Sequence, residues 1–234
     1  MPAHLHRALR APFTTCLLVL GCVIATPATA RAETQGAEAD HAPPALSGYA
    51  GAAEDVAERI QRFAADVRRS GDAGGRPFSI IDKGGATLWV FDAEGRALAQ
   101  SPVLVGEASG DVAPADIGQR PLSKVRPHEK ITSAGRYLTE PGRNHKGEDI
   151  VWLDYEAALS MHRVRNVPGE ARTRRLQTPG VQDNRISFGC VNIPAGFYER
   201  MIDPMFSRRS GVVYVLPEKQ PLASVFAFVG GAAN

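Results

Sequence analysis

The sequence contains little cysteine and no apolar run long enough to cross a bilayer. It has 3 cysteines in 234 residues, and two of them, Cys16 and Cys22, lie in an N-terminal segment that we expect to be removed. Cys190 is then the only cysteine left, so a scaffold held together by internal disulfides is excluded. The Cys190 thiol is either buried and inert or available for reaction, and both alternatives stay open at this point.

An excess of charge of one sign is also missing. The formal net charge is +2, but three arginines lie in residues 1–32, where there is no acidic residue. Beyond residue 32 the acidic residues outnumber the basic ones by one, so we expect no nucleic-acid partner. One cysteine and scattered histidines offer no ligand spacing for zinc, and we therefore expect neither a metal nor a cofactor.

Residues 1–32 have the layout of a secretory signal peptide. A basic start precedes an apolar run at 13–25, and two overlapping A-x-A cleavage sequences follow at 28–32. The apolar run is about 13 residues long, too short to span a bilayer core of roughly 30 Å as a helix. We expect export to the periplasm or cell envelope without stable membrane insertion. A retained membrane anchor and a lipoprotein anchored through Cys22 are the alternatives.

The remaining chain is mainly β in its patterning. Apolar residues spaced by four, three and four positions predict one amphipathic helix over 52–69, and alternating runs farther along predict strands. The strands are expected at residues 78–81, 87–91, 97–105, 136–138, 150–153, 158–164, 186–193 and 212–216. Residues 106–131 and 165–184 are expected as long loops, and residues 194–202 as a short helix. The predicted fold is therefore mainly β with short helices, preceded by one N-terminal amphipathic helix.

These patterns divide the chain into four parts. A leader at 1–32 is followed by a linker and helix at 33–75, a β-rich domain at 76–217 and a C-terminal tail at 218–234. The sequence gives no indication of the oligomeric state.

Cys190 lies in a segment suited to a nucleophile. Gly189 allows the backbone to turn sharply beside the thiol. The N–H groups of Gly189 and Cys190 would then point at the oxygen of a carbonyl attacked by the sulfur, as an oxyanion hole requires. The alternative is a small buried side chain without chemistry.

His162 is the candidate base because it alone among four histidines beyond the leader lies in a predicted strand. If the strands at 158–164 and 186–193 are neighbours, they present the imidazole and the thiol together. Such a pair lowers a cysteine pKa from about 8.5 to roughly 3.5–7.5. A purely structural histidine is the alternative.

The connection between His162 and Cys190 is rich in arginine. It carries six arginines against two acidic residues, either as a positive rim that attracts substrate carboxylates or as a solvated loop. The arginines are Arg163, Arg165, Arg172, Arg174, Arg175 and Arg185.

Three motifs in this order resemble those of the L,D-transpeptidase (YkuD-type) catalytic domain. Residues 132–137 (TSAGRY) resemble T-P-x-G-x-[FY], residues 161–163 resemble the strand of the base histidine, and residues 187–192 (SFGCVN) resemble [ST]-H-G-C-x-[NR]. The resemblance covers about residues 76–217 and implies a β-sandwich enzyme that cross-links peptidoglycan.

The resemblance also implies the roles of single residues. Cys190 would attack the bond after the third residue of a peptidoglycan stem peptide, with His162 as base, the Gly189 and Cys190 amides as oxyanion hole and the Arg163 carbonyl orienting the imidazole. Terminal D-alanine would leave, and an amine of a second stem or protein would resolve the thioester. The residues expected to line the substrate site are Asn192, Ser187, Tyr137, Phe188 and Arg185.

Two departures from the family pattern leave other functions open. Phe188 replaces the usual histidine two residues before the cysteine, and the connection after His162 is long. Water in place of the amine would make the protein an L,D-carboxypeptidase or another hydrolase. A non-catalytic cell-wall-binding module is expected only if Phe188 has disabled the site.

Overall fold

The computed structural model describes residues 50–230, with side chains from residue 56 onward. The predicted signal peptide, the lipoprotein-like sequence around Cys22 and most of the linker lie outside the described residues. The described part belongs to one compact unit, Leu46–Asn234. Within it, no helix is both long and apolar enough to cross a membrane.

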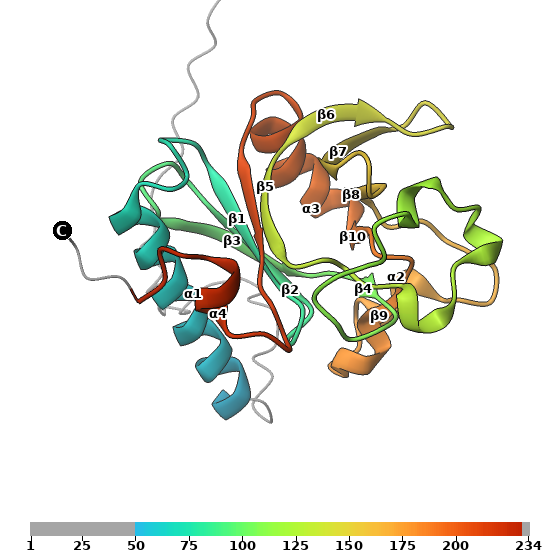
Figure 1. Ribbon diagram of the computed structural model, residues 1–234, viewed down its shortest axis with the longest axis horizontal. Helices are drawn as coiled ribbons and strands as arrows, with labels where there is room; N and C mark the ends of the chain where they lie inside the picture. The colour runs from blue at the N-terminus through green and yellow to red at the C-terminus, as the bar shows by residue number, and fades with distance from the viewer. Residues whose placement is uncertain (1–49, 231–234) are drawn as a thin grey trace, which may run out of the picture. The chain divides into compact units, whose positions relative to one another are not determined.

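The larger sheet has five strands in the order β3-β2-β1-β11-β5 (Figure 1). Its middle is built from distant parts of the chain, because β11 lies parallel to β1 and antiparallel to β5. The strands are β1 (Phe78–Asp82), β2 (Thr87–Phe91), β3 (Ala97–Pro102), β5 (Gly135–Leu138) and β11 (Val212–Val215).

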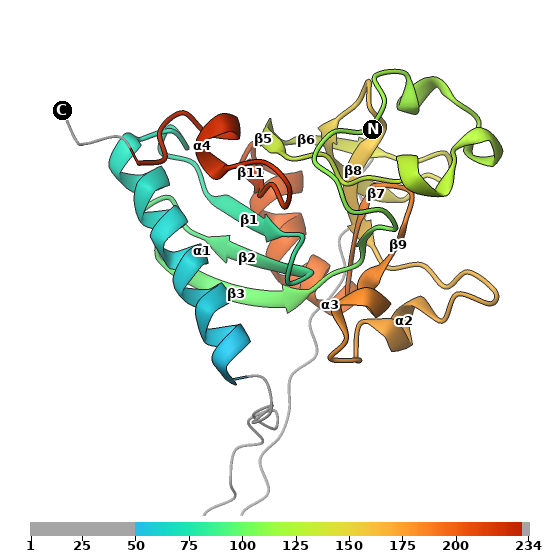
Figure 2. The ribbon, with the colours of Figure 1, turned by 60° about the horizontal axis from the view of Figure 1, so that its bottom comes forward.

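Helix α1 (Ala50–Ser70) covers one face of this sheet (Figure 2). Phe63 on the helix stacks edge-on against Tyr214 of β11 and Phe226, with ring centroids 5.5 and 4.9 Å apart. Phe226 follows the short helix α4 (Leu222–Val225) and is 2% exposed. Part of the segment 218–234, separated above as a tail, therefore packs with α1 in an apolar cluster.

The second sheet has four strands in the order β10-β8-β7-β6. One of its faces shares a buried core with the far face of the five-stranded sheet and with the helical segment α3 (Ala195–Phe197) and η5 (Tyr198–Ser207). Val151, Met161 and Val191 point into this core, so alternate residues of the same strands point to the other face. The strands are β6 (Glu140–Arg143), β7 (Asp149–Asp154), β8 (Leu159–Arg163) and β10 (Val191–Ile193).

Short elements fill the two long loops. A third sheet pairs β4 (Val105–Gly106) with β9 (Arg185–Ser187) in parallel. The other elements are η1 (Ile117–Gln119), η2 (Leu122–Lys124), η3 (Pro127–Glu129), α2 (Arg172–Arg175) and η4 (Val181–Asn184).

The predicted fold class, mainly β with short helices, is confirmed, while several boundaries differ. The run expected at 186–193 is two strands in different sheets, because Gly189 turns the chain at a φ of 132° between β9 and β10. The run at 97–105 is likewise divided between β3 and β4. Strand β6 was not expected, since it contains Pro141 and Gly142, residues that a sheet tolerates at an edge such as this one.

Candidate active site

The candidate nucleophile and base lie on two neighbouring parallel strands. Residue His162 of β8 is paired with Asn192 of β10, and Cys190 immediately precedes β10 opposite Ser160. Because Met161 and Val191 point into the core, Ser160, His162 and Cys190 share the opposite face. The structure thus brings together the two side chains that the sequence singled out from separate motifs.

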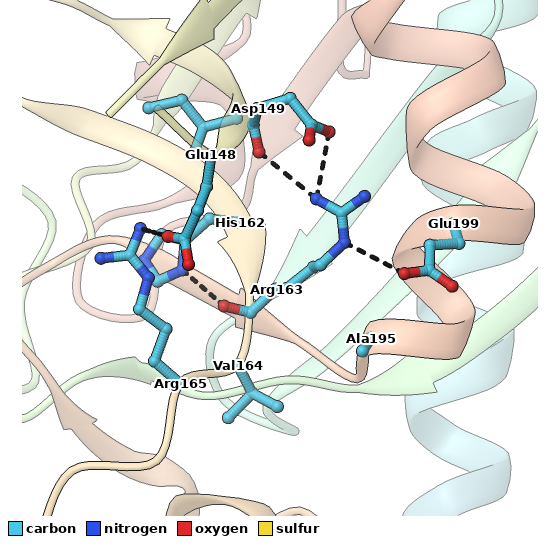
Figure 3. A pocket seen from close by; sticks show the side chains of 9 residues that line it. Glu148, Asp149, His162, Arg163, Val164, Arg165, Ala195 and Glu199 are labelled. Atoms are coloured by element: carbon cyan, nitrogen blue, oxygen red, sulfur yellow. Dashed lines mark hydrogen bonds and ion pairs between the residues drawn. The ribbon is translucent and has the colours of Figure 1, made fainter. Parts of the chain in front are cut away.

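The imidazole of His162 is oriented by its own strand. Its Nδ1 lies 2.8 Å from the carbonyl oxygen of Arg163, the contact expected above (Figure 3). A proton on Nδ1 that donates to this carbonyl leaves the lone pair on Nε2, the atom a base needs. The Arg163 guanidinium is held by Asp149 and Glu199, at 3.0 and 3.3 Å.

The surroundings of Cys190 favour its thiolate. Burial by itself raises the pKa of the half-buried thiol, but the hydrogen bond and charge of His162, aided by Ser160, outweigh it and hold the pKa below its ordinary value. The Ser160 hydroxyl lies 3.5 Å from the sulfur, and the thiol donates to the carbonyl oxygen of Ala158 at 3.2 Å. Ser160 was missed in the sequence, because only the strand register reveals that it faces the thiol.

The turn that carries Cys190 is held tightly by the loop before β5. The hydroxyl of Thr132 donates to the carbonyl oxygen of Gly189 at 2.6 Å and accepts from the N–H of Gly106 at 2.8 Å. A Cβ on residue 189 would lie 2.8 Å from the carbonyl oxygen of Ile131. Both the positive φ and this close approach therefore require glycine at position 189.

The oxyanion hole differs from the expectation of two free amides. The N–H of Gly189 donates to the hydroxyl of Ser187 at 3.1 Å, a local contact that a serine two residues earlier readily makes. Within the described residues the N–H of Cys190 has no acceptor. One backbone donor, from Cys190, is therefore free for a developing oxyanion, and Ser187 is buried at 2% exposure.

Two residues expected to line the substrate site, Asn192 and Arg185, are bonded to other groups of the protein. Asn192 is completely buried, with its amide nitrogen 3.0 Å from the Cys190 carbonyl oxygen and its amide oxygen 3.0 Å from Arg172. Arg185 forms an ion pair with Glu218 and donates to the Lys83 carbonyl oxygen at 3.1 Å. Asn192 therefore supports the cysteine turn, and Arg185 belongs to a buried ionic cluster.

Tyr137 and Phe188, the two aromatic candidates for the substrate site, have different surroundings. The Tyr137 hydroxyl donates to the Ser133 carbonyl oxygen at 3.0 Å, and burial together with Asp154 raises the pKa of Tyr137 to about 12. Phe188 lines a small hollow next to Gly189 and lies under the ammonium of Lys130, 4.5 Å from the ring centroid. Tyr137 therefore braces its own loop, whereas Phe188 lines the hollow next to Gly189.

The positive rim expected from the arginine-rich connection is largely neutralised. Arg163 and Arg165 pair with acidic residues of β7 and the segment before it, including a 2.6 Å contact between Arg165 and Glu148. Arg172 pairs with Glu170. The pairs of Arg163 with Asp149 and of Arg165 with Glu148 form because the hairpin of β6 and β7 brings acids next to the end of β8, which sequence order does not reveal.

A hollow of about 390 Å³ opens on the imidazole side of the site (Figure 3). Its wall mixes both charges and includes His162 itself. The lining residues are Glu148, Asp149, Ile150, His162, Arg163, Val164, Arg165, Ala195 and Glu199. Among the described side chains there is no group of three or more His, Cys, Asp or Glu that could hold a metal ion.

Comparisons with known proteins give matches among solved structures alone. No protein-family model matches the sequence, and no curated protein matches it. The chain is similar to an L,D-transpeptidase of Stackebrandtia nassauensis, with 16% identity and a TM-score of 0.38 over 61% of this chain and 56% of that one. It is also similar to an L,D-transpeptidase from Mycobacterium smegmatis, with 12% identity and a TM-score of 0.34 over 60% and 58%.

The catalytic domain of an Enterococcus faecium L,D-transpeptidase is a further match. Identity is 15% and the TM-score is 0.31, over 61% of this chain and 98% of that domain. The match spans a little more than half the length of the first two structures.

Proposed function

We propose that the protein is a cysteine-dependent L,D-transpeptidase acting on peptidoglycan stem peptides. The observation that carries the proposal is that His162 of β8 and Cys190, which precedes the neighbouring strand β10, lie on the same sheet face, with the Cys190 pKa held below its ordinary value. A lone inert cysteine needs neither an oriented imidazole nor a hydroxyl beside its sulfur. Such a constellation is suited to acyl transfer.

In the first half of the proposed reaction the donor stem acylates the enzyme. The Cys190 thiolate attacks the carbonyl carbon of the third stem residue, while the Cys190 N–H donates to the oxygen that gains negative charge. The imidazolium of His162 gives its proton to the nitrogen of the departing D-alanine as the C–N bond breaks. A thioester on Cys190 and a neutral imidazole remain.

The second half releases the acyl group to an acceptor. A neutral amine of a second stem or of a protein attacks the thioester carbon and passes a proton to His162. The C–S bond breaks, which restores the thiolate and imidazolium and leaves a new amide between the two stems. Water in place of the amine gives trimming of the stem by the same residues, so the acceptor decides between cross-linking and hydrolysis.

The proposal includes export of the protein to the cell envelope, where peptidoglycan lies. It is supported by the signal-peptide layout of residues 1–32, with cleavage near Ala32.

The test starts with the thiol and needs no substrate. In protein beginning at Glu33, the rate of Cys190 alkylation is measured against pH for the wild type and for His162→Ala. We expect a midpoint below the ordinary range of a cysteine in the wild type, returning towards it in the variant. A wild-type thiol that is unreactive, or indifferent to His162, contradicts the proposal.

Purified muropeptides then identify the reaction. Incubation with tetrapeptide stems is expected to give cross-linked dimers and free D-alanine, detected by mass spectrometry. Cys190→Ser is the matched control and should give neither product. Tripeptide stems and D-alanine without dimers would show the hydrolase instead, and an activated thiol with no turnover would leave wall binding as the function.

A further inference from the structure

An aromatic pair lies on the same sheet face as the nucleophile, two strands away. Trp152 of β7 is paired directly with Ser160 of β8, and Ser160 contacts the sulfur of Cys190. Val151 and Leu153, the neighbours of Trp152, are buried in the core, so Trp152 points to the opposite face. Tyr155 follows β7 and meets Trp152 edge-on, with ring centroids 5.1 Å apart.

The indole packs against strand β6, and Tyr155 leaves one side of the pair exposed. A Cβ on Gly142 of β6 would lie 2.2 Å from Nε1 of Trp152, so only glycine allows the ring to lie against this strand. Trp152 is half-buried with its Nε1 edge packed against β6, whereas Tyr155 is 68% exposed. Large exposed aromatic side chains next to a reactive site commonly mark a place where a ligand binds.

The separation between Cys190 and Trp152 indicates which part of the proposed substrate reaches the aromatic pair. Two spacings between neighbouring strands place Trp152 about 10 Å from the position of Cys190 along the sheet. In the proposed function the cysteine attacks the carbonyl of the third stem residue, and three extended residues span about 10 Å. A stem that runs along the sheet from Cys190 towards β7 therefore brings its sugar to Trp152 and Tyr155 when the scissile carbonyl is at Cys190.

We propose that Trp152 and Tyr155 form a subsite for the glycan of the donor, a deepening that rests on the proposed function. The apolar C–H face of a pyranose ring packs against an aromatic ring such as that of the exposed Tyr155. Acidic residues at 140, 154 and 156 surround the pair and disfavour a carboxylate ligand, whereas a neutral sugar is not repelled. An acceptor amine is excluded here because it must come into contact with the thioester carbon at Cys190.

Binding is tested without catalysis. The chain has 2 tryptophans, so Trp89→Phe leaves Trp152 as the only indole. Peptide-free glycan strands are titrated into Trp89→Phe/Cys190→Ala protein, with the fluorescence of Trp152 as the readout. A saturable change that Tyr155→Ala weakens and Leu98→Ala does not is the expected result. Leu98 is a matched control, since it is 48% exposed but lies on β3 of the other sheet.

Turnover gives the second readout. The wild type is expected to favour a disaccharide tetrapeptide over the sugar-free tetrapeptide in kcat/KM, and Tyr155→Ala to lose about two- to tenfold on the first donor alone. Equal use of both donors by the wild type, an equal loss on both, or no fluorescence change with glycan overturns the subsite. If neither donor is turned over but glycan still binds at Trp152, the transpeptidase proposal fails and the glycan site stands.

Discussion

The two main sheets of this protein are used in different ways. The five-stranded sheet is covered on both faces, by α1 with the segment after β11 on one side and by the common core on the other. The four-stranded sheet has one face in that core, and its opposite face carries Ser160, His162 and Cys190. The residues that fill the core and the residues of the candidate site therefore lie on different sheet faces, so that the side chains of the candidate site are not needed to fill the core.

The largest effect on the stability side is expected at the cluster under α1. Phe63→Ala removes a 2%-exposed ring that packs against Tyr214 and Phe226, and should lower the free energy of unfolding by about 3–5 kcal/mol. Urea unfolding measures this loss. At 25 °C the folded variant should keep the wild-type pH profile of Cys190 alkylation, and a shifted midpoint would show that the two regions are coupled.

A buried ionic cluster at the end of β1 should give the next largest effect. Asp111 accepts from Lys83 at 2.9 Å and from the backbone N–H groups of residues 218–220. Although burial opposes it, these donors lower the pKa of Asp111 to about 2. Asp111→Asn leaves Lys83 buried without its partner and should cost about 3 kcal/mol at pH 7.

The same carboxylate predicts the pH dependence of stability. A lowered folded-state pKa means that the contribution of Asp111 is complete above pH 4 and is lost as the pH falls towards 2. Urea unfolding at pH 7 and pH 3 should therefore show a smaller acid-induced loss in Asp111→Asn than in the wild type. An equal loss in both proteins would mean that other carboxylates control acid unfolding.

On the sheet face that carries Cys190 we expect the opposite pattern, with a large effect on the proposed reaction and a small effect on stability. His162→Ala should slow acylation roughly 100-fold, because it removes the proposed general base and the group that lowers the Cys190 pKa. Its unfolding midpoint should stay close to that of the wild type, since the half-buried imidazole lies outside the core. Single-turnover acylation and urea unfolding on the same preparation measure both quantities.

The smallest effect is expected at Ser160. Ser160→Ala removes a donor to the sulfur, so the pKa of Cys190 should rise, but less than in His162→Ala. Ser79→Ala is the control, because Ser79 is equally buried in β1 and its hydroxyl has no partner among the described residues. Alkylation profiles that move alike in both serine variants would remove Ser160 from the site.

The sequence predicted the elements that carry the site better than the contacts within it. Cys190 and His162 stood out because each lies at the end of or inside an apolar run, and the expected neighbouring strands are those observed. The contact of Ser160 with the thiol depends on the register of the neighbouring strands. The hydrogen bond from Arg172 to the Asn192 side chain depends on a loop that folds back onto β10. Neither contact can be recognised from the residues next to it in the sequence.

The same limit applies to charge and to strand β6. Counting charges from residue 163 to residue 185 predicted a positive rim, whereas the acidic partners of Arg163, Arg165 and Arg185 come from β7 and the residue before it, η5 and the segment after β11. Strand β6 contains Pro141 and Gly142, which argue against a strand until its place at the sheet edge is known. Long-range packing, and not local preference, decides both cases.

Cys190, the proposed nucleophile, lies where the chain passes from one sheet to another. β9 belongs to the small sheet with β4, β10 belongs to the four-stranded sheet, and Thr132 holds the turn between them. One end of this turn is anchored by the ladder with β4 and the other by the ladder with β8, and Leu104, next to β4, is also bonded to Asn192 of β10. The Cys190 backbone therefore has little conformational freedom to lose when the tetrahedral intermediate of the proposed reaction forms. The entropy cost of positioning the sulfur is met when the protein folds.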